Sequence, residues 1–320
     1  MKIVKRVAAA LCVAVSCAAG AQQFPSRPVH IVVPFAPGGN LDVTARLIGE
    51  SMSKTLGQPF VIDNRAGAGG AVGQEAVARA APDGYTLVAA TPGTTIVSPL
   101  MIPTPPYSRA DFAPVGIMAV TPLLLEVPAA SPYPDFKSYV AAVKANPGKV
   151  TIGHSGNGTT NHIAILELQE ALKVRFNIVP YKGSGPALVD LIGGQIDSMV
   201  DQTSSSLPHI RAGKLRALAV GTPERLPDLP DVPTLQEEGV KDFEATTPSA
   251  LLAPAKTPPD VIRVLNDALG KALADPAVRA KLKGLGSGIR STTPGELDAF
   301  MRGEEKKLKA LHEQGVLKGG

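Results

Sequence analysis

The chain contains no tryptophan, and aromatic residues make up only 4% of its 320 residues. Its charges nearly cancel, because 32 lysine and arginine residues face 28 acidic ones and leave a net charge of +4. Proteins that bind nucleic acids combine a strongly basic surface with aromatic side chains that stack on bases. We therefore expect no nucleic-acid partner for this chain.

Cysteine is nearly absent as well, since Cys12 and Cys17 are the only two and both lie near the N-terminus. The rest of the chain can form no disulfide, no thiolate nucleophile and no cysteine metal site. The five histidines are scattered, without the short spacing typical of zinc ligands. We therefore expect no metal site and no cofactor, and a fold stabilised by burial of apolar side chains.

A single long apolar run covers residues 7–19, fewer than the roughly 20 residues that a membrane-spanning helix needs. It follows a basic start and ends in Ala19-Gly20-Ala21, the small-x-small pattern of a signal peptidase site. This order predicts a signal peptide at residues 1–21 and a periplasmic mature chain. Removing its three basic residues lowers the net charge from +4 to +1. Two less favoured alternatives are an ordinary buried helix and a lipoprotein signal at Cys17, whose lipobox lacks the usual leucine.

Short β-branched runs alternate with helical patterns in the first part of the mature chain. We expect strands at residues 29–33, 60–62 and 85–89, with helices at 43–56 and 72–80 between them. This βαβαβ order is typical of a parallel sheet with helices on both faces.

The pattern restarts after a proline-rich interval at residues 99–106. Expected strands lie at 123–127, 149–153, 177–179, 196–200 and 215–220, and expected helices at 136–144, 160–172 and 186–192. A strand at 250–253 and helices at 259–274 and 294–311 follow. Two similar α/β units predict two lobes with a ligand cleft between them, because such sheets bind ligands where strands lead into helix N-termini.

Two glycine-rich loops follow strands in the two units. The first is Pro34-Phe35-Ala36-Pro37-Gly38-Gly39-Asn40-Leu41-Asp42, and the second is Ser155-Gly156-Asn157-Gly158-Thr159-Thr160. Glycine permits tight turns that point N–H groups inward, and a helix start adds partial positive charge. The matching positions of the loops favour anion capture, although either loop alone could serve turn geometry only.

Two segments match enzyme motifs only in part. Gly67-Ala68-Gly69-Gly70-Ala71-Val72 approaches the dinucleotide-binding GxGxxG pattern but has Val72 in place of the last glycine. Gly153-His154-Ser155-Gly156-Asn157 approaches the GxSxG nucleophile elbow but ends in asparagine, and no later histidine follows a convincing strand end. We therefore expect no catalytic residue, and a periplasmic serine hydrolase using Ser155 is kept as the alternative function.

Several longer motifs resemble one family of binding proteins. They are Phe24-Pro25-Ser26-Arg27-Pro28, residues 31–39, Asp63-Asn64-Arg65-Ala66-Gly67, Ala81-Pro82-Asp83-Gly84-Tyr85, Val179-Pro180-Tyr181-Lys182-Gly183, residues 207–220 and Leu252-Ala253-Pro254-Ala255. In this order they resemble the Bug family, the periplasmic substrate-binding proteins of tripartite tricarboxylate transporters. The resemblance runs from about Phe24 to the C-terminus.

The resemblance implies an α/β, two-lobed periplasmic-binding-protein (Venus-flytrap) fold that binds a carboxylate between its lobes. One domain would comprise residues 22–121 and 245–320, and the other residues 122–244. The implied ligand-binding residues, together with Asp42 of the first glycine loop, are Phe35, Ala36, Gly38, Gly39, Thr91, Gly93, Thr94, Ser155, Gly156, Asn157, Gly158, Thr159, Thr160 and Asp201.

The implied function is capture of a small mono-, di- or tricarboxylate, amino acid or aromatic acid, without catalysis. The expected partner is a membrane permease or a signalling sensor, and we expect a monomer. Two segments depart from the family pattern: Thr246-Thr247-Pro248-Ser249 replaces a common aromatic pair near the hinge, and Gln202-Thr203-Ser204-Ser205 replaces an Asn-Leu-Pro-Ser stretch beside the expected pocket.

Asp201 permits two interpretations. It follows the apolar Met199-Val200 at the end of an expected strand, on the side where the glycine loops converge. Its carboxylate would repel a ligand carboxylate at short range. It would therefore accept a hydrogen bond from a ligand hydroxyl or ammonium, or else only fix the loop at residues 202–206.

The signal peptide yields the first prediction. Cleavage after Ala21 should give a mature chain that begins at Gln22, and the intact mass of protein from a periplasmic extract measures this directly. A lipid adduct on Cys17 would contradict cleavage at this position.

Overall fold

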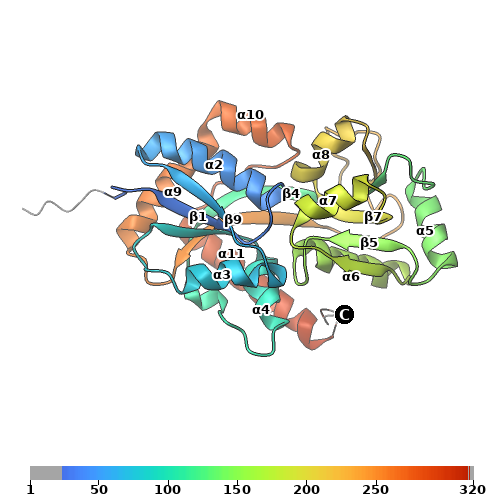
Figure 1. The fold of residues 1–320 in the computed structure, drawn as a ribbon, viewed down its shortest axis with the longest axis horizontal. Helices are drawn as coiled ribbons and strands as arrows, with labels where there is room; N and C mark the ends of the chain where they lie inside the picture. The colour runs from blue at the N-terminus through green and yellow to red at the C-terminus, as the bar shows by residue number, and fades with distance from the viewer. Residues whose placement is uncertain (1–23, 316, 318–320) are drawn as a thin grey trace, which may run out of the picture.

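The computed structural model describes residues 24–315 and 317, so the predicted signal peptide and Gln22 lie outside the described residues. Two α/β lobes lie side by side along the long axis of the molecule, and two long strands, β4 and β9, connect them (Figure 1). The two-lobed fold predicted from the sequence is confirmed.

The first lobe contains the parallel strands β1 (Val29–Val33), β2 (Phe60–Asn64) and β3 (Thr86–Ala90), in the order β2-β1-β3-β9-β4. Buried residues of α2 (Asn40–Leu56), α9 (Pro259–Ala274) and α10 (Pro276–Gly284) form one core cluster with Val29, Ile31 and Val33. Val32, which points to the opposite face, packs in a second cluster with residues of α3 (Ala71–Ala78) and α11 (Pro294–Glu313). Both faces of β1 are therefore buried, as expected for a β-branched strand covered by helices on two sides.

The second lobe repeats this arrangement with the parallel strands β5 (Thr151–His154), β6 (Asn177–Pro180) and β7 (Ser198–Gln202). Strand β8 (Leu215–Val220) pairs antiparallel with β4. The helices are α5 (Phe136–Ala145), α6 (Thr160–Leu172), α7 (Ser184–Ile192) and α8 (Thr203–Arg211). Residues of α5, α6 and the strands build a core of their own.

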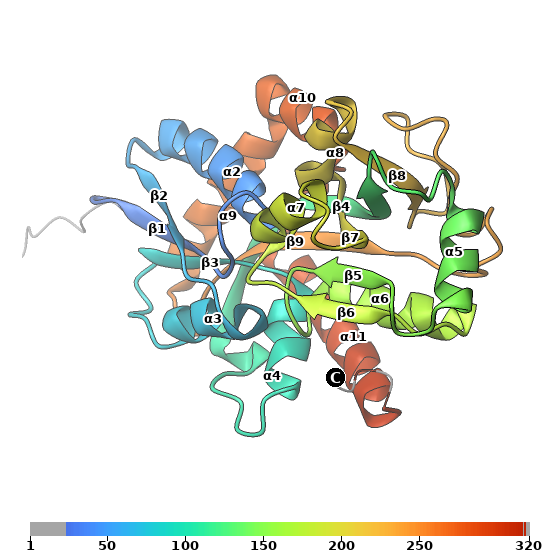
Figure 2. The ribbon, with the colours of Figure 1, turned by 45° about the vertical axis from the view of Figure 1, so that its right-hand side comes forward.

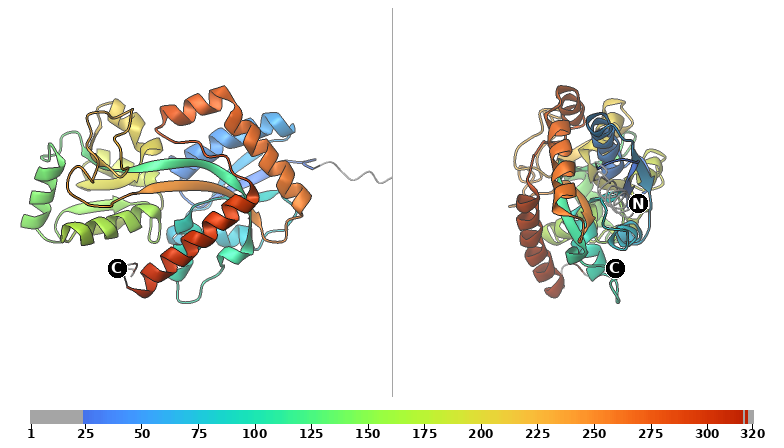
Figure 3. Two further views of the ribbon diagram at one scale, coloured as in Figure 1. Left: turned by 180° about the vertical axis from the view of Figure 1, so that it is seen from behind. Right: turned by 90° about the vertical axis from the view of Figure 1, so that its left-hand side faces the viewer.

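Strands β4 (Phe112–Pro128) and β9 (Thr246–Pro254) run antiparallel to each other across both lobes, and we call them the hinge strands (Figure 3). Their pairing ends at Thr121↔Thr247 and Pro122↔Thr246, and from Leu123 onward β4 pairs with β7 and β8 instead. The domain boundaries at 121/122 and 244/245 stay a prediction, and this change of partners supports them.

Most expected elements appear within two or three residues of their predicted bounds, but three features differ. The first half of β4 was not expected, because Pro114, Gly116 and Pro122 interrupt its sequence pattern. Helix α8 was missed because it is rich in serine and contains Pro208, and α10 was missed as well. The sheet is mixed rather than purely parallel, because both hinge strands run antiparallel to their neighbours.

Short helical turns complete the chain: η1 (Ala68–Gly70), η2 (Gly93–Val97), α4 (Ser98–Leu100) and η3 (Arg109–Asp111). The turn η2 has the wider π-helical geometry and directly follows the loop after β3. Within residues 24–315 and 317, no helix combines the length and the apolar character needed to cross a membrane.

Candidate functional site

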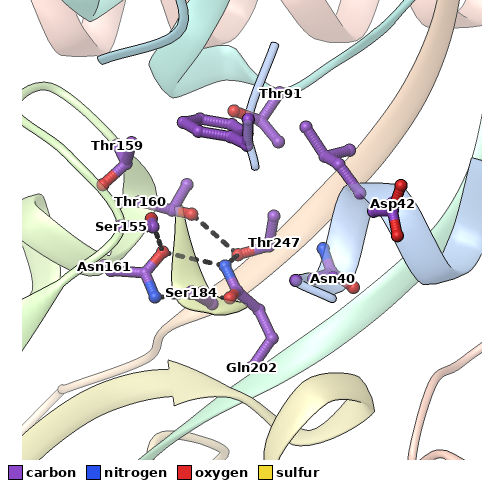
Figure 4. Close-up of a pocket in the computed structure, with 13 residues that line it drawn as sticks. Asn40, Asp42, Thr91, Ser155, Thr159, Thr160, Asn161, Ser184, Gln202 and Thr247 are labelled. Atoms are coloured by element: carbon purple, nitrogen blue, oxygen red, sulfur yellow. Dashed lines mark hydrogen bonds between the residues drawn. The ribbon is translucent and has the colours of Figure 1, made fainter. Parts of the chain in front are cut away.

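A pocket lies between the lobes, where the carboxyl ends of β1, β3, β5 and β7 meet near the start of β9. Its wall is made of side chains from both lobes and from β9 (Figure 4). The lining residues are Phe35, Gly39, Asn40, Leu41, Asp42, Thr91, Ser155, Thr159, Thr160, Asn161, Ser184, Gln202 and Thr247.

Three helices begin at this pocket, with Asn40 of α2, Thr160 of α6 and Ser184 of α7 in their first turns. Helix α6 is capped by the Thr159 hydroxyl, but α2 and α7 follow glycines and have no side-chain cap. Each helix start carries roughly half a positive charge on unpaired N–H groups. The lining contains no lysine, arginine or histidine, so the helix starts supply its positive potential.

The two lobes touch around the pocket, as Figure 2 shows for α7 and the loop before α2. The Ala36 N–H donates to the Lys182 carbonyl at 2.9 Å, and the Ser204 hydroxyl donates to Asn40 Oδ1 at 2.7 Å. The enclosed free space is about 20 Å³, which holds about one water molecule. The structure is therefore a closed conformation, and its lobes are closer together than they would be with a ligand of several heavy atoms between them.

The second glycine-rich loop approaches the segment of residues 93–98 in the first lobe so closely that added side chains would collide there. A Cβ at Gly93 would lie 2.7 Å from the Gly158 carbonyl, and one at Gly158 would lie 3.0 Å from Ser98. The φ of Gly158 is +78°, a conformation that side chains disfavour. Because they lack side chains, these glycines allow the two lobes to approach each other beside the pocket. They do not line the pocket themselves.

Two stacked histidines hold the second glycine loop in place. The rings of His154 and His162 lie 4.5 Å apart, and their Nδ1 atoms accept the N–H groups of Gly156 and Gly158 at 3.1 and 3.2 Å. Burial lowers the pKa of His154 to about 3 and that of His162 to about 4. Both rings are therefore neutral near pH 7, with the hydrogen on Nε2, and they fix the loop rather than supply charge.

A network of neutral polar side chains lines the wall beside β9. Gln202 Nε2 donates to Asn161 Oδ1 at 2.9 Å and to Thr247 Oγ1 at 3.0 Å. The hydroxyls of Thr160 and Thr247 are 2.8 Å apart. The wall therefore offers hydroxyl and amide groups but no side-chain charge.

Comparisons of the sequence with known proteins identify the family of this chain. The family model for the tripartite tricarboxylate transporter family receptor, TctC, matches residues 44–316. The chain belongs to this family. Two relatives are a UPF0065 protein from the tcbD–tcbE intergenic region of a Pseudomonas species, 40% identical over 290 residues, and BugT of Bordetella pertussis, 36% identical over 286 residues. The matches cover 90% of this chain and 86% of the first relative, and 89% of this chain and 88% of the second.

Solved structures extend the likeness to three dimensions. A periplasmic transporter structure has a TM-score of 0.89 with 40% identity, covering 92% of this receptor and 99% of that chain. MatC of Rhodopseudomonas palustris, with bound malate, has a TM-score of 0.86 with 36% identity, covering 92% and 100%. A protein of R. palustris solved with adipate has a TM-score of 0.88 with 33% identity, covering 92% and 98%. The resemblance to the Bug family is thus confirmed, and the receptors of this family are periplasmic solute-binding proteins.

The pocket of this receptor contains part of the predicted site. The predicted residues that line it are Phe35, Gly39, Asp42, Thr91, Ser155, Thr159 and Thr160. The structure places the others outside the lining: Ala36, Gly38, Gly93, Thr94, Gly156, Asn157, Gly158 and Asp201. The lining residues absent from the prediction are Asn40, Leu41, Asn161, Ser184, Gln202 and Thr247. For all of these residues, a role in ligand binding stays a prediction.

A sequence signal existed for some of the omitted residues. Asn40 and Asn161 lie one position past Gly39 and Thr160, in the first turns of helices that were expected next to the site. Ser184 opens a helix after the Lys182-Gly183 motif. Thr247 comes from β9, far along the chain, and only the pairing of the hinge strands brings it to the pocket.

Asp42 borders the pocket, but its carboxylate points away from the other labelled side chains (Figure 4). It accepts hydrogen bonds from the Gly38 N–H, from Arg46 and from Asn64. Burial acts to raise the pKa of Asp42, but these bonds outweigh it and hold the pKa below its usual value. Asp42 therefore stays ionised and paired, and it braces the first glycine loop.

Asp201 is fully buried behind the pocket wall. Its carboxylate accepts hydrogen bonds from the hydroxyls of Ser184 and Ser205, both at 2.5 Å. It also accepts a hydrogen bond from the side-chain amide of Asn161 at 3.1 Å. Burial raises the pKa of Asp201 even though these bonds act in the opposite direction. This arrangement favours the second interpretation, in which Asp201 holds the start of α8 and the side chains around it.

A second carboxyl group, Glu126 on β4, joins this buried cluster. The Ser206 hydroxyl lies 2.7 Å from Glu126 Oε1 and 3.1 Å from Asp201 Oδ2, and its single hydrogen can serve only one of them. Burial and the neighbouring Asp201 carboxylate raise the pKa of Glu126 well above its usual range. A protonated Glu126 can donate to Ser206, which then donates to Asp201.

Closure of the lobes yields the second prediction. The backbone of Gly39 is extended, with φ −88°, so valine fits its conformation. A Cβ there would lie 3.3 Å from Ser184 Cβ across the cleft, and the branched side chain should keep the lobes apart. We expect Gly39→Val to weaken ligand binding more than about tenfold with an unchanged melting temperature. Calorimetry against Gly303→Val, at an exposed glycine of α11, measures this, and wild-type binding by Gly39→Val would show that the loop is only a turn.

The buried carboxylate yields the third prediction. In Asp201→Asn, an amide NH₂ group replaces one of the carboxylate oxygens that accept hydrogen bonds from buried serine hydroxyls. We therefore expect the free energy of unfolding to fall by about 2 kcal/mol. Binding of hydroxy, amino and plain carboxylic acids should weaken equally, because the side chain lies behind the wall. Urea unfolding and calorimetry test this, with Asp242→Asn at an exposed turn as control. A selective loss for hydroxy and amino acids at unchanged stability would instead place Asp201 in contact with the ligand.

Proposed function

We propose that this receptor captures a small organic carboxylate between its lobes in the periplasm and delivers it to a membrane permease or a signalling sensor. The observation that carries the proposal is the convergence of α2, α6 and α7 on one pocket without a cationic side chain. Such a site attracts an anion through helix starts and N–H groups, and a carboxylate is an anion of suitable size.

Rough magnitudes support binding without a cation. A hydrogen bond to a charged group contributes about 1.5–3 kcal/mol net, and a helix start adds about 0.3–1 kcal/mol or more where partly buried. Four to six donors would approach the roughly 8 kcal/mol of micromolar affinity after ordering costs are subtracted. The malate and adipate in the two R. palustris structures are both carboxylates, which supports this ligand class.

The geometry around Ser155 gives no support to the hydrolase alternative. Its hydroxyl donates to Asn161 Oδ1 at 3.0 Å, whereas the Nδ1 atoms of His154 and His162 accept backbone N–H groups. A serine nucleophile needs a base within hydrogen-bond reach of its hydroxyl. We therefore propose that the receptor binds its ligand without chemistry.

Ligand binding is the fourth prediction. Because the ligand contacts both lobes in the closed state, a small carboxylate should raise the melting temperature progressively with concentration. Native mass spectrometry of freshly purified protein should show a co-purified acid, and calorimetry with mono-, di- and tricarboxylates should identify the tightest class. Failure of every acid to bind would refute the proposal. Ester hydrolysis that is abolished by Ser155→Ala would favour the hydrolase instead.

A further inference from the structure

Two carboxyl groups are buried together behind the pocket wall, and we call Glu126 of β4 and Asp201 of β7 the buried pair. Both side chains are fully buried, and the Ser206 hydroxyl of α8 lies within hydrogen-bond distance of each. Within residues 24–315 and 317, no lysine, arginine or histidine forms an ion pair with either group. Two negative charges at this place would therefore repel each other without compensation.

The elements around the buried pair carry charged and titratable groups of their own: Asp42 and Arg46 of α2, Asp190 of α7, His209 and Arg211 of α8, and Arg216 of β8. Asp42 and Arg46 pair with each other, and Arg211 pairs with Asp228. Asp190 accepts a hydrogen bond from a tyrosine hydroxyl, and Arg216 donates to two backbone carbonyls. In the described part of the chain, the His209 ring forms no hydrogen bond with the pair. The two carboxyl groups therefore act mainly on each other.

The hydrogen bonds show which member of the pair holds a proton. Asp201 accepts from two serine hydroxyls and from Asn161 in addition to its contact with Ser206. Glu126 contacts Ser206 alone, and its Oε2 has no hydrogen-bond partner among the described residues. A buried oxygen without a partner costs far more in an ionised carboxylate than in a neutral acid. Asp201 therefore carries the charge, and Glu126 keeps a hydrogen that it can donate to Ser206.

The charge on Asp201 orients two residues of the pocket. Ser184 at the start of α7 and Asn161 in the first turn of α6 both donate to Asp201 Oδ1, and both line the pocket (Figure 4). A second charge on Glu126 would compete with Asp201 for the single hydrogen of Ser206. It would also repel both the Asp201 carboxylate and an anion in the cleft.

We infer that Glu126 is a positioning residue that works as a neutral acid: its proton leaves Asp201 as the single charge behind the wall, so that Ser184 and Asn161 stay in place. Loss of this proton at alkaline pH would then weaken anion capture. The inference rests on the proposed function, because it concerns the control of the same pocket by pH.

The expected pH dependence of stability has a definite sign. Burial and the Asp201 charge raise the pKa of Glu126 well above its ordinary value of 4.5, so the folded chain holds a proton that the unfolded chain releases. The stability that Glu126 contributes is therefore complete below pH 4.5 and falls as the pH rises toward the raised pKa.

The variant Glu126→Gln tests this, because it keeps the size of the side chain and a neutral donor. From about pH 5 to about pH 8, the unfolding constant of the wild type should rise relative to that of Glu126→Gln by up to about tenfold per pH unit, as linkage of one proton requires. Urea unfolding measures both constants, and Glu170→Gln, at an exposed position of α6, should follow the wild type. Parallel curves for the wild type and Glu126→Gln overturn the inference.

Carbon NMR assigns the proton to its residue. With glutamate labelled at the side-chain carboxyl carbon, the wild type at pH 7 should show the signal of a protonated acid, and Glu126→Gln should lack it. Glu167→Gln should retain this signal, which makes it the matched control, because burial also raises the pKa of Glu167. Absence of the signal from the wild type, or its survival in Glu126→Gln, overturns the inference.

Calorimetry connects the proton to binding, with malate and adipate as probes. While NMR shows Glu126 protonated, the affinities of the wild type and Glu126→Gln should agree within about twofold. At a pH where NMR shows Glu126 ionised, the wild type should bind about tenfold more weakly than the variant. Affinities that differ while Glu126 is protonated, or that stay equal after it ionises, overturn the positioning role.

Failure of the inference and failure of the proposed function give different results. Parallel unfolding curves or a missing NMR signal overturn the role of Glu126 and leave carboxylate capture intact. Absence of binding for every acid overturns the proposed function, whereas the unfolding and NMR measurements still decide where the proton lies.

Discussion

The proposed function depends on one electrostatic constraint: a pocket with no cationic side chain can hold an anion only when several helix starts converge on it and water is excluded. Roughly half a charge at each start of α2, α6 and α7 is weak in water but stronger in a closed cleft. The starts come from different lobes, so the site is complete only in the closed form. Under the proposed function, capture and closure would be one event, in which the ligand contributes the charge that holds the lobes together.

The same constraint explains the buried groups around the pocket. Arg46 and Asn64 pair with the Asp42 carboxylate, which points away from the pocket (Figure 4). Asp201 lies behind the wall, where serine hydroxyls and the start of α8 compensate its charge. The two histidines remain neutral because they are buried, and they order the loop without adding charge. Each group supports the pocket wall, and the side chains that face the pocket carry no positive charge.

The hinge strands bring distant parts of the chain together at the pocket wall. Thr247 belongs to β9, the strand that crosses between the lobes, and it bonds to Thr160 and Gln202 of the second lobe. Gln202 and Thr247, which line the pocket, both lie in the segments 202–205 and 246–249 that the sequence analysis set apart from the family pattern.

The sequence alone determined the alternation of strands and helices, the two lobes, the family and the two glycine loops, because these follow from local periodicity and short motifs. The loops after strand ends predicted Phe35, Gly39, Ser155, Thr159 and Thr160 as site residues, the family resemblance added Thr91, and all six line the pocket. Only the tertiary structure showed that Gly93, Gly158 and their neighbours bring the lobes together, and that Asp201 is buried behind the wall. Thr247 could not be found locally, because antiparallel pairing of two hinge strands more than 100 residues apart brings it to the pocket. Local propensity specifies helices and turns, but which side chains share a cleft depends on long-range pairing, which no single segment encodes.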